Sequence, residues 1–342
     1  MLFRAVHMPR LYSELPDDLG VASRHCAQVL SLLQDTEANC VLLVDDGNVM
    51  TSEISRAVHR WPPKYRGRAK EMLEKLRKSQ RFVRVRDDGE VDVACGSGDC
   101  GHTVAVCRRE VPQILLGPAA CEECASLAAC EVAFTSINDY PISPFSRLRK
   151  DSESLILADS QWDKSGFQQK VWDPLFRYAK HVKLVDRYAG RHLQKEGGGY
   201  RLSVNANYAR SIEWIFGRFA ALSAGRPVRS FEIACGLESD RLSDSEMLGA
   251  TQVLRGFVRG LSERYGLEMT VHVKVESHGA EIRHARFIIT DQMAMAVDRG
   301  FDLLKANDTI RDVHISLIYN PGEMERQLRD LPDVPEVAGS PE

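Results

Sequence analysis

The residues with the clearest chemical potential are His284, Arg286 and Asp291, in the stretch HARFIITDQMAMAVDRGFD. His284 and Arg286 stand two residues apart at the start of an apolar run, and alternate residues of a strand point to the same side. An imidazole and a guanidinium would then face one ligand. Histidine can attack phosphorus or protonate a leaving oxygen, and a fixed cation can hold the non-bridging oxygens. With Asp291 orienting the imidazole, the pattern predicts a site for a phosphate ester.

A structural reading of the same residues stays open. In it, His284 is a partly buried histidine at a strand edge that donates to a backbone carbonyl. Arg286 then pairs with Asp291 or Glu281, and Arg299 only covers a surface. For an isolated histidine–arginine pair this structural reading would be preferred. The choice between it and a phosphate site therefore depends on the surrounding sequence.

A second group of candidate residues is acidic and lies in the first half of the chain. The apolar run NCVLLVDD contains Asp45, Glu53 follows at the expected start of a helix, and Asp99 precedes a short helix or strand in GSGDCGHTVAVC. Carboxylates gathered at strand ends bind Mg²⁺ or Mn²⁺, which take oxygen ligands and activate water. Asp45, Glu53 and Asp99 are therefore candidate metal ligands. Alternatively, these acids cap helices and turns, because DDG is a common turn sequence.

Nine cysteines, an odd number, fit reduced thiols better than a disulfide framework. Most of them gather in one region: Cys95, Cys100, Cys107, Cys121, Cys124 and Cys130. Such a group can supply thiolate ligands to zinc. However, the spacing is loose, and Cys107 and Cys130 stand among apolar residues as buried thiols do. We therefore do not expect zinc at this cluster.

Helix and strand patterns alternate along the chain and predict an α/β fold. We predict helices over residues 20–34, 64–80, 166–182 and 207–222, one opening with a capping box at Ser243 and Glu246, and a final helix near residues 322–331. The predicted strands cover residues 39–46, 81–85, 183–188, 229–235, 267–275, 286–290, 293–297 and 313–319.

The bulk composition indicates a folded protein of two domains. With 342 residues the chain is longer than one average domain, and proline, serine and charge replace the periodic pattern near residues 143–155. Charged residues make up 27% and hydrophobic residues 44%, which is typical of globular proteins. The net charge of -3 gives no global basic signal, so any nucleic-acid contact must come from a local patch. No membrane span or secretory signal is visible, and we expect a cytoplasmic protein.

The second half of the chain resembles the phospholipase-D superfamily, whose motif is H-x-K-x-x-x-x-D. It is most similar to the phospholipase-D-like C-terminal domain of MIT-domain proteins and its bacterial relatives. The matching blocks are LVDRY with Asp186 and Tyr188, then IEWI, HARFII and DRGFD, in that order over about residues 152–325. This chain has arginine at Arg286 where the motif has lysine.

The resemblance implies a fold and a mechanism. It implies an α/β sandwich in which one histidine forms a covalent phosphohistidine and a second acts as general acid, without a metal or other cofactor. Because this chain carries one motif and shows no internal repeat, activity would require a homodimer that brings two copies of His284 together. Arg286 would be the phosphate clamp, Arg299 a second phosphate contact and Asp291 the orienting carboxylate. Since arginine binds phosphate well but is larger and forked, phosphate or lipid-head-group binding without cleavage is the alternative.

The first half resembles a bacterial PIN-like nuclease family in the order of VDDGNVMTSEI, GDCGHTVAVC and EVAFTSINDYPI. No early strand ending in aspartate is visible, and ILLGPAAC has glycine where the family has an acidic pair. Glu53, Asp99 and Asp45 remain for Mg²⁺ or Mn²⁺. We therefore interpret this half as a PIN-like domain that is degenerate in its acidic set.

The expected architecture is a PIN-like α/β layer over residues 1–145, a phospholipase-D-like α/β sandwich over residues 152–331 and a disordered tail over residues 332–342. The expected function is a nucleic-acid-directed phosphodiesterase or nuclease that acts on DNA or RNA, of a bacterial defence type. The alternative is a catalytically inactive scaffold, or a regulatory subunit with a protein partner.

Overall fold

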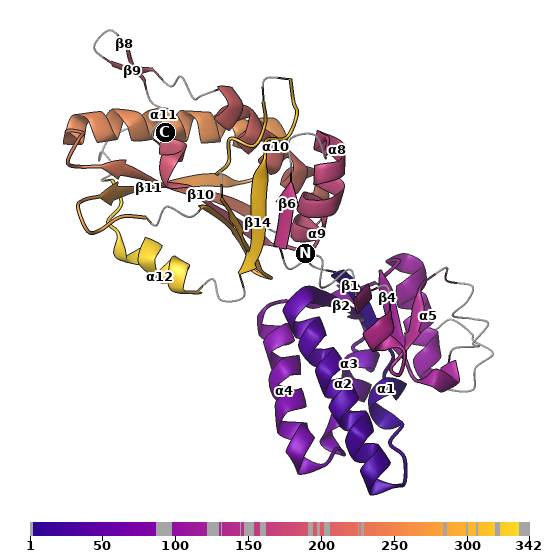
Figure 1. The fold of residues 1–342 in the computed structure, drawn as a ribbon. Coiled ribbons are helices and arrows are strands. Elements are labelled where there is room, and N and C mark those ends of the chain that lie inside the picture. Colours follow the sequence, from indigo (N-terminus) through magenta and orange to yellow (C-terminus); the bar gives the residue numbers. More distant parts are fainter. Residues whose placement is uncertain are drawn as a thin grey trace. The chain divides into compact units, whose positions relative to one another are not determined.

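The computed structural model shows two compact α/β units, Met1–Ser152 and Glu153–Glu342 (Figure 1). We refer to them as the N-terminal unit and the C-terminal unit. The division falls within the segment, residues 143–155, where the sequence pattern changes. The structure describes residues 3–86, 98–121, 130, 132–143, 145–146, 154–157, 162–190, 194–196, 199–201, 206–224, 226, 229–282, 286–298, 300–305, 307–318 and 322–334.

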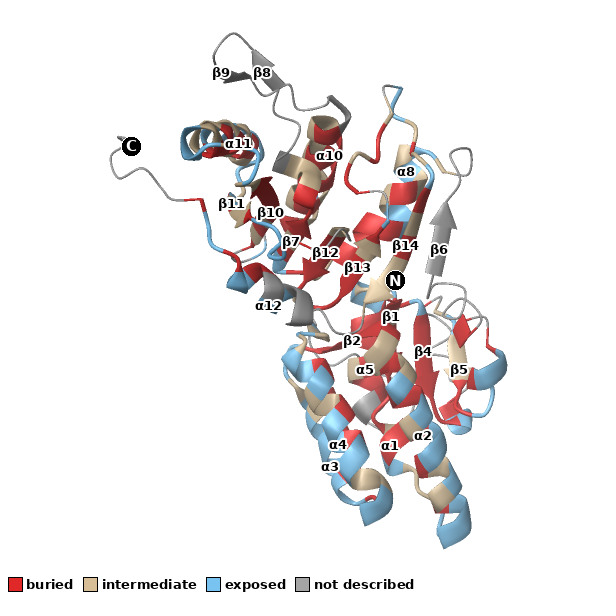
Figure 2. Ribbon diagram, turned by 60° about the vertical axis from the view of Figure 1, so that its left-hand side comes forward, coloured by how far each residue is buried: buried red, intermediate tan, exposed pale blue. Residues whose placement is uncertain are grey.

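The N-terminal unit is built on a parallel five-stranded sheet in the order β3-β2-β1-β4-β5. Every residue of β2 and β4 is buried, as expected for a parallel sheet covered on both faces (Figure 2). The strands are β1 (Phe3–His7), β2 (Cys40–Asp45), β3 (Phe82–Val85), β4 (Ile114–Gly117) and β5 (Phe134–Ser136).

The central strand β1 is not evident from the sequence pattern. Its five residues, FRAVH, include an arginine and a histidine, yet only Arg4 is more than slightly exposed. Pairing with β2 on one side and β4 on the other holds it in the middle of the sheet. We predicted no strand here, and the strand ends at His7 rather than at an aspartate.

Helices connect these strands, and the predictions over residues 20–34 and 64–80 are confirmed by α2 and α4. The Asp18 side chain caps α2 by accepting the Val21 N–H at 2.8 Å, and proline opens α4. The described α-helices of this unit are α1 (Arg10–Ser13), α2 (Leu19–Asn39), α3 (Val49–His59), α4 (Pro63–Lys78) and α5 (Gly98–Arg109), with short 3-10 turns η1 (Ala119–Cys121) and η2 (Tyr140–Ile142).

The C-terminal unit contains a mixed seven-stranded sheet in the order β11-β10-β7-β12-β13-β14-β6. β7, β10 and β11 are parallel, and the remaining neighbours are antiparallel. The strands are β6 (Ser154–Leu157), β7 (His181–Val185), β10 (Ser230–Glu238), β11 (Met269–Glu276), β12 (Arg286–Thr290), β13 (Ala294–Val297) and β14 (Val313–Ile318). A separate hairpin joins β8 (Gln194–Glu196) and β9 (Gly199–Arg201).

Helices pack on both faces of this sheet. Adjacent residues of a strand point to opposite faces; Cys235 of β10 packs in a cluster with Leu254 of α11, and Ala234 packs in a cluster with Leu328 of α12. The helices are α8 (Lys164–Phe167), α9 (Asp173–Phe176), α10 (Ala206–Ser223), α11 (Asp244–Tyr265) and α12 (Gly322–Asp330), with a 3-10 turn η4 (Arg187–Gly190).

Two helix predictions have different outcomes. The capping box of α11 is confirmed, since the Ser243 side chain accepts the Glu246 N–H while Glu246 accepts the Ser243 N–H, and Gly266 ends the helix in the left-handed conformation. The single helix predicted over residues 166–182 is wrong in detail. A π-helical turn, η3 (Gln168–Trp172), separates α8 from α9, and the helical segment ends at Phe176.

The chain after α12 pairs with the edge of the C-terminal sheet. Val275 N–H donates to the Pro332 carbonyl and Val334 N–H donates to the Val273 carbonyl, each at 2.8 Å. The Val334 side chain is buried with residues of β11 and α11. Residues 332–334 therefore do not belong to a disordered tail as we expected, because backbone pairing and an apolar anchor hold them. Residues 335–342 lie outside the described part of the chain.

Gly117 of β4 provides a test of how tightly the N-terminal sheet is packed. A Cβ at Gly117 would lie 2.6 Å from the Met8 sulfur and 2.8 Å from the Phe134 ring. We expect Gly117→Ala to lower the free energy of unfolding by about 1–3 kcal/mol in urea denaturation followed by circular dichroism.

Gly67→Ala is the matched control, because a Cβ there has no neighbour within 4 Å and Gly67 lies inside α4. It should raise the free energy of unfolding by about 0.5–1 kcal/mol. Equal effects of the two substitutions would contradict the close approach at Gly117.

Candidate phosphate site at the edge of the C-terminal sheet

Arg286 lies where the direction of the C-terminal sheet changes. It is the first residue of β12, which runs antiparallel to β7, so Arg286 lies beside the carboxyl end of β7. The carboxyl ends of β10 and β11 share this edge because both strands are parallel to β7. Ligands of open α/β sheets commonly bind outside the carboxyl ends of parallel strands, where the strand order switches. This edge is therefore the candidate site of the unit.

Asp186, the residue after β7, organises the site. Its side chain is fully buried. One carboxylate oxygen accepts the Tyr188 N–H at 2.9 Å, and the other accepts the Phe301 N–H at 3.1 Å and the Tyr208 hydroxyl. Burial raises the pKa of Asp186, although these hydrogen bonds and the charge of Arg286 act in the opposite direction. A single carboxyl group thus joins the end of β7 to α10 and to the loop after β13.

The guanidinium of Arg286 is held on three sides. Its Nε lies 3.8 Å from the Asp186 carboxylate, its Nη1 donates to the Asp298 carbonyl at 2.6 Å, and its Cζ lies 5.0 Å from the centre of the Tyr188 ring. The Nε is buried without a hydrogen-bond partner among the described residues. The side chain keeps 20% of its surface exposed. The site therefore presents a fixed cation whose side chain stays partly accessible.

Gly300 makes this approach of Arg286 to Asp186 possible. Its φ is +88°, and a Cβ at this position would lie 2.8 Å from Arg286 Nε and 3.0 Å from the Asp186 carboxylate. A side chain would both strain the backbone and displace the guanidinium. The glycine of the DRGFD stretch thus has a direct role in the site.

A buried ion cluster anchors the segment that enters the site. Arg187, only 3% exposed, lies 2.8 Å from the Glu276 carboxylate and 2.7 Å from the Glu281 carboxylate. The other oxygen of Glu276 accepts the Ile282 N–H at 2.8 Å. Burial opposes the charge of Arg187, but its hydrogen bonds to the two glutamates outweigh this effect and raise its pKa. Residues 281 and 282, which precede the segment 283–285, and Arg286, which follows it, are therefore all anchored.

Two of the predicted site residues, His284 and Arg299, lie outside the described residues. The alternative in which Arg286 pairs with Asp291 or Glu281 is wrong, since its acidic neighbour is Asp186 and Glu281 pairs with Arg187. Tyr208 and the Arg187 cluster were not among the predicted site residues. Few features of the sequence mark these residues as part of a site. Arg187 follows the end of a strand, and Tyr208 stands at the start of a helix.

Asp291 does not lie in this site, which corrects the prediction that it acts beside Arg286. It follows the last residue of β12, and five strand steps of about 3.3 Å separate it from Arg286. Its carboxylate accepts the N–H groups of Lys180 and His181, at the opposite end of β7. Asp291 fixes the turn between β12 and β13 to the start of β7.

The three acidic candidates of the N-terminal unit have separate surroundings. Both oxygens of the buried Asp45 carboxylate accept backbone N–H groups at 2.7 Å, from Val49 and Met50, so the alternative in which this acid caps a helix is confirmed. Glu53 pairs with Arg56 at 2.9 Å on the surface of α3. The backbone of Asp99 lies in the first turn of α5 rather than before the helix. No group of three or more metal-ligating side chains occurs within the described residues.

The strand-order switch of the N-terminal sheet, between β1 and β4, is occupied by His7 and Met8 instead of acids. His7 is fully buried, with one ring nitrogen 2.6 Å from the Tyr12 hydroxyl and the other 3.1 Å from the Thr36 hydroxyl. Burial lowers the pKa of His7 to about 3, so the ring is neutral at physiological pH. With both nitrogens engaged, His7 supports packing at this point.

The described members of the cysteine cluster are buried and free of disulfides: Cys100, Cys107, Cys121 and Cys130. Burial, followed by the nearby Cys130, raises the pKa of Cys107, which keeps this thiol protonated. Arg10 Nη1 lies 3.8 Å from the Cys121 sulfur. Cys95 and Cys124 lie outside the described residues.

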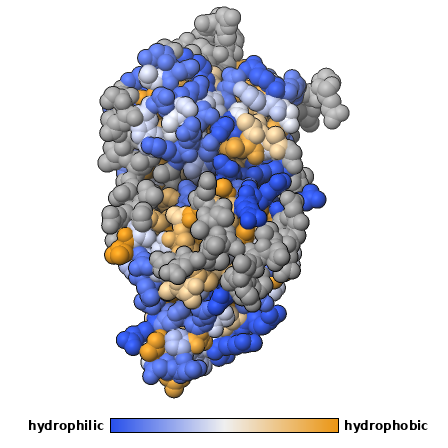
Figure 3. Space-filling model, turned by 90° about the vertical axis from the view of Figure 1, so that its right-hand side faces the viewer, coloured by the Kyte–Doolittle hydropathy of each residue, from blue (hydrophilic) through white to orange (hydrophobic). Residues whose placement is uncertain are grey.

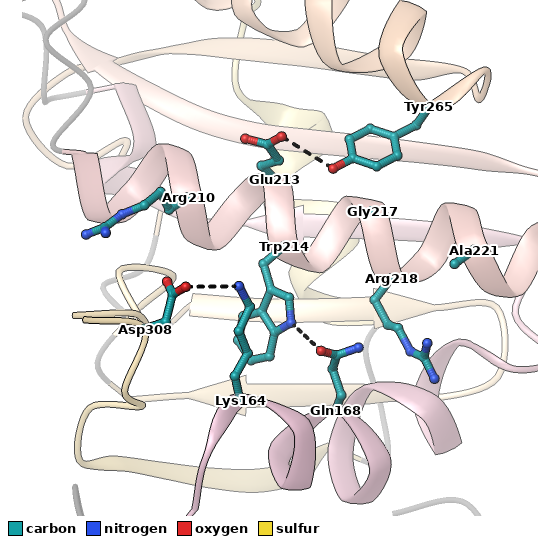
Figure 4. Close-up of a pocket in the computed structure, with 10 residues that line it drawn as sticks. All are labelled: Lys164, Gln168, Arg210, Glu213, Trp214, Gly217, Arg218, Ala221, Tyr265 and Asp308. Carbon is teal, nitrogen blue, oxygen red and sulfur yellow. Dashed lines mark hydrogen bonds and ion pairs between the residues drawn. The ribbon is translucent and has the colours of Figure 1, made fainter. Parts of the chain in front are cut away.

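A cavity of about 450 Å³ lies along α10, on the C-terminal unit (Figure 4). Its central Trp214 donates to the side chain of Gln168, from the π-helical turn, at 3.0 Å. The Lys164 ammonium lies 3.7 Å from Asp308, and Glu213 accepts the Tyr265 hydroxyl at 3.3 Å. Because these polar groups already form hydrogen bonds and ion pairs with one another, the cavity is less suited to bind a charged ligand than the Arg286 site.

Neither the surface of the protein nor its comparison with known proteins indicates a function. Hydrophilic residues cover much of the face drawn in Figure 3, with smaller hydrophobic areas between them. None of the described helices has the length and apolar character needed to cross a membrane. Comparison of the chain with protein-family models, with curated proteins and with solved structures gave no match.

Gly300→Ala should disturb the Arg286 site more than a second glycine substitution with the same backbone strain. Gly279 has a φ of +82°, close to that of Gly300, but a Cβ there meets nothing within 4 Å. We expect Gly300→Ala to lower the free energy of unfolding by about 1–3 kcal/mol more than Gly279→Ala, because it also displaces Arg286. Denaturant titration of both variants measures the difference, and equal losses would mean that Arg286 and Asp186 do not meet at Gly300.

Asp45→Asn separates the capping role from metal binding. The amide retains only one acceptor oxygen for two N–H groups, so we expect the free energy of unfolding to fall by about 1 kcal/mol or more. Glu53→Gln, which breaks an exposed ion pair, should cost no more than about 1 kcal/mol. Thermal unfolding would be recorded with EDTA and with Mn²⁺. If Mn²⁺ stabilises the wild-type protein but neither variant, these carboxylates bind metal.

Proposed function

We propose that the C-terminal unit is a nucleic-acid-directed phosphodiesterase whose site is the sheet edge at Arg286. The observation that carries the proposal is the fixed guanidinium at the switch of strand direction, which belongs to a side chain that keeps 20% of its surface exposed. His284 precedes Arg286 by two residues in the same stretch of sequence. Arginine binds non-bridging phosphate oxygens through paired hydrogen bonds.

In the proposed reaction, His284 is the nucleophile. A ring nitrogen forms a bond to phosphorus while the ester bond to the leaving oxygen breaks, and Arg286 and Arg299 hold the non-bridging oxygens. The leaving oxygen takes a proton from His284 of a second copy of the chain. Water then cleaves the phosphohistidine and returns a proton to the second histidine. The mechanism needs no metal, and it requires a homodimer because each chain carries one motif.

The buried anchors contribute by positioning. Arg187 and Glu276 hold the residues before the segment 283–285, and Asp186 and Asp298 hold Arg286 after it. Anchoring these flanking residues reduces the entropy that they lose when a substrate is oriented. Asp186 is too enclosed for direct contact with a substrate, since its side chain is fully buried.

A second candidate function is phosphate or lipid-head-group binding without cleavage, in a scaffold or regulatory subunit. One observation favours it: Asp186 already offsets part of the charge of Arg286 at 3.8 Å, and most of the arginine side chain is buried. Such a site holds an anion more readily than it stabilises additional charge in a transition state.

For the N-terminal unit we propose a PIN-like domain without a working metal set that serves as a docking module for a protein partner.

His284→Ala tests the phosphodiesterase proposal, with His278→Ala as the matched control. His278 is exposed and lies in the preceding turn. Labelled single-stranded and double-stranded DNA and RNA would be incubated with each variant in EDTA, after size-exclusion chromatography has established that all of them form the same oligomer. We expect cleavage by the wild-type protein and by His278→Ala, and a loss of roughly a thousandfold in His284→Ala.

Other results assign the activity elsewhere. Cleavage that requires Mn²⁺ and is unaffected by His284→Ala would move the chemistry to the acidic residues of the N-terminal unit. Absence of cleavage, together with liposome or phosphate binding that falls with salt and with Arg286→Gln, would establish the binding function. A monomer with full activity would contradict the shared site.

A further inference from the structure

The N-terminal unit also contains a cavity, and the proposed function does not use it. It measures about 450 Å³ and lies between α3, α4 and the strands β2 and β3. Cavities of roughly 300–1,000 Å³ with apolar walls and a few polar groups are typical of small-molecule sites. By its size, this cavity can hold a small molecule.

The floor of the cavity is apolar. Ile54 and Val58 of α3 contribute buried side chains, and Leu73 of α4 and Phe82 of β3 are half-buried against the same core. The two half-buried residues expose apolar surface to the cavity. An occupant that covers this surface gains hydrophobic stabilisation, so the floor favours a ligand with an apolar body.

The rim carries positive charge that acidic groups do not neutralise. Lys70 donates to the Nε2 of His59 at 3.0 Å, and the Nδ1 of His59 lies 3.1 Å from the Ser55 carbonyl. With Nδ1 donating to that carbonyl, Nε2 accepts from the ammonium, so this contact brings no negative charge to Lys70. Arg84 of the edge strand has no ion-pair or hydrogen-bond partner in the part of the chain that the structure describes.

The one carboxylate of the rim has its own cation. Glu74 accepts two hydrogen bonds from the guanidinium of Arg77, at 2.8 and 2.6 Å. The hydrogen bond with Arg77 lowers the pKa of Glu74. Lys70 and Arg84 are therefore the rim charges that remain for a ligand, and both are positive.

We propose that this cavity binds a small organic anion with an apolar body. The body would cover Leu73 and Phe82, and the anionic group would accept hydrogen bonds from Lys70 and Arg84. The ligand has about the size of a nucleotide or a medium-chain fatty acid. The anionic end and the apolar end distinguish it from a neutral hydrophobe and from inorganic phosphate.

The test uses two fluorescent probes on the full-length protein: 8-anilinonaphthalene-1-sulfonate and the same molecule without the sulfonate, 1-anilinonaphthalene. We expect the sulfonate to bind saturably at one site and more tightly than the uncharged probe. Lys70→Gln should weaken the sulfonate by roughly tenfold and leave the uncharged probe unchanged. Lys75→Gln is the matched control, since Lys75 lies on the same helix, outside the cavity, and pairs with Glu71.

A second pair of variants locates the probes. Ser55 lines the cavity and Ser52 does not, although both are exposed residues of α3. Ser55→Phe should fill the cavity and abolish binding of both probes, while Ser52→Phe should retain it. Binding that persists in Ser55→Phe, or that Lys70→Gln and Lys75→Gln affect equally, would overturn the proposal. Displacement by decanoate or by adenosine monophosphate identifies the class of natural anion, and displacement by neither at millimolar concentration also overturns it.

Discussion

The buried carboxylate of Asp186 is the interaction on which the C-terminal site depends. It accepts hydrogen bonds from residues that follow β7, open α10 and follow β13, and it faces the guanidinium at the start of β12. Four segments distant in the sequence meet at one side chain. Burying a carboxyl group is costly unless hydrogen bonds compensate it, so the group requires all of these segments to be in place. Its position therefore couples the fold of the unit to the geometry of Arg286.

The regular elements were predictable because their patterns are local. The capping box at Ser243 and Glu246 and the apolar faces of α2 and α4 arise within a few turns of helix. The alternation over residues 267–275 likewise marks β11. β1 lacked such a pattern because its burial comes from neighbouring strands that are distant in the sequence. For the same reason the pairing of Arg187 with Glu276 was not predicted, because these two residues are 89 positions apart in the sequence.

The candidate site was predictable in part. The prediction that His284 and Arg286 share one side of a strand stays untested, because His284 lies outside the described residues. The spacing of five from Arg286 to Asp291, in contrast, spans the whole of β12. Strand geometry alone could have separated them, since each residue advances the chain by about 3.3 Å. For Asp45 the sequence could not separate two roles, because a turn or helix cap and a metal site both use aspartate. Only the observed hydrogen bonds to Val49 and Met50 distinguish the two.

The pairing of residues 332–334 with β11 has a consequence for the protein in solution. β11 is the outermost strand on its side of the sheet, and an unpaired strand edge is a template for association with other chains. By placing its own backbone against Val273 and Val275, the chain occupies part of that edge with groups that a neighbouring molecule would otherwise use. The segment after the last helix thus shields part of the β11 edge from pairing with another chain.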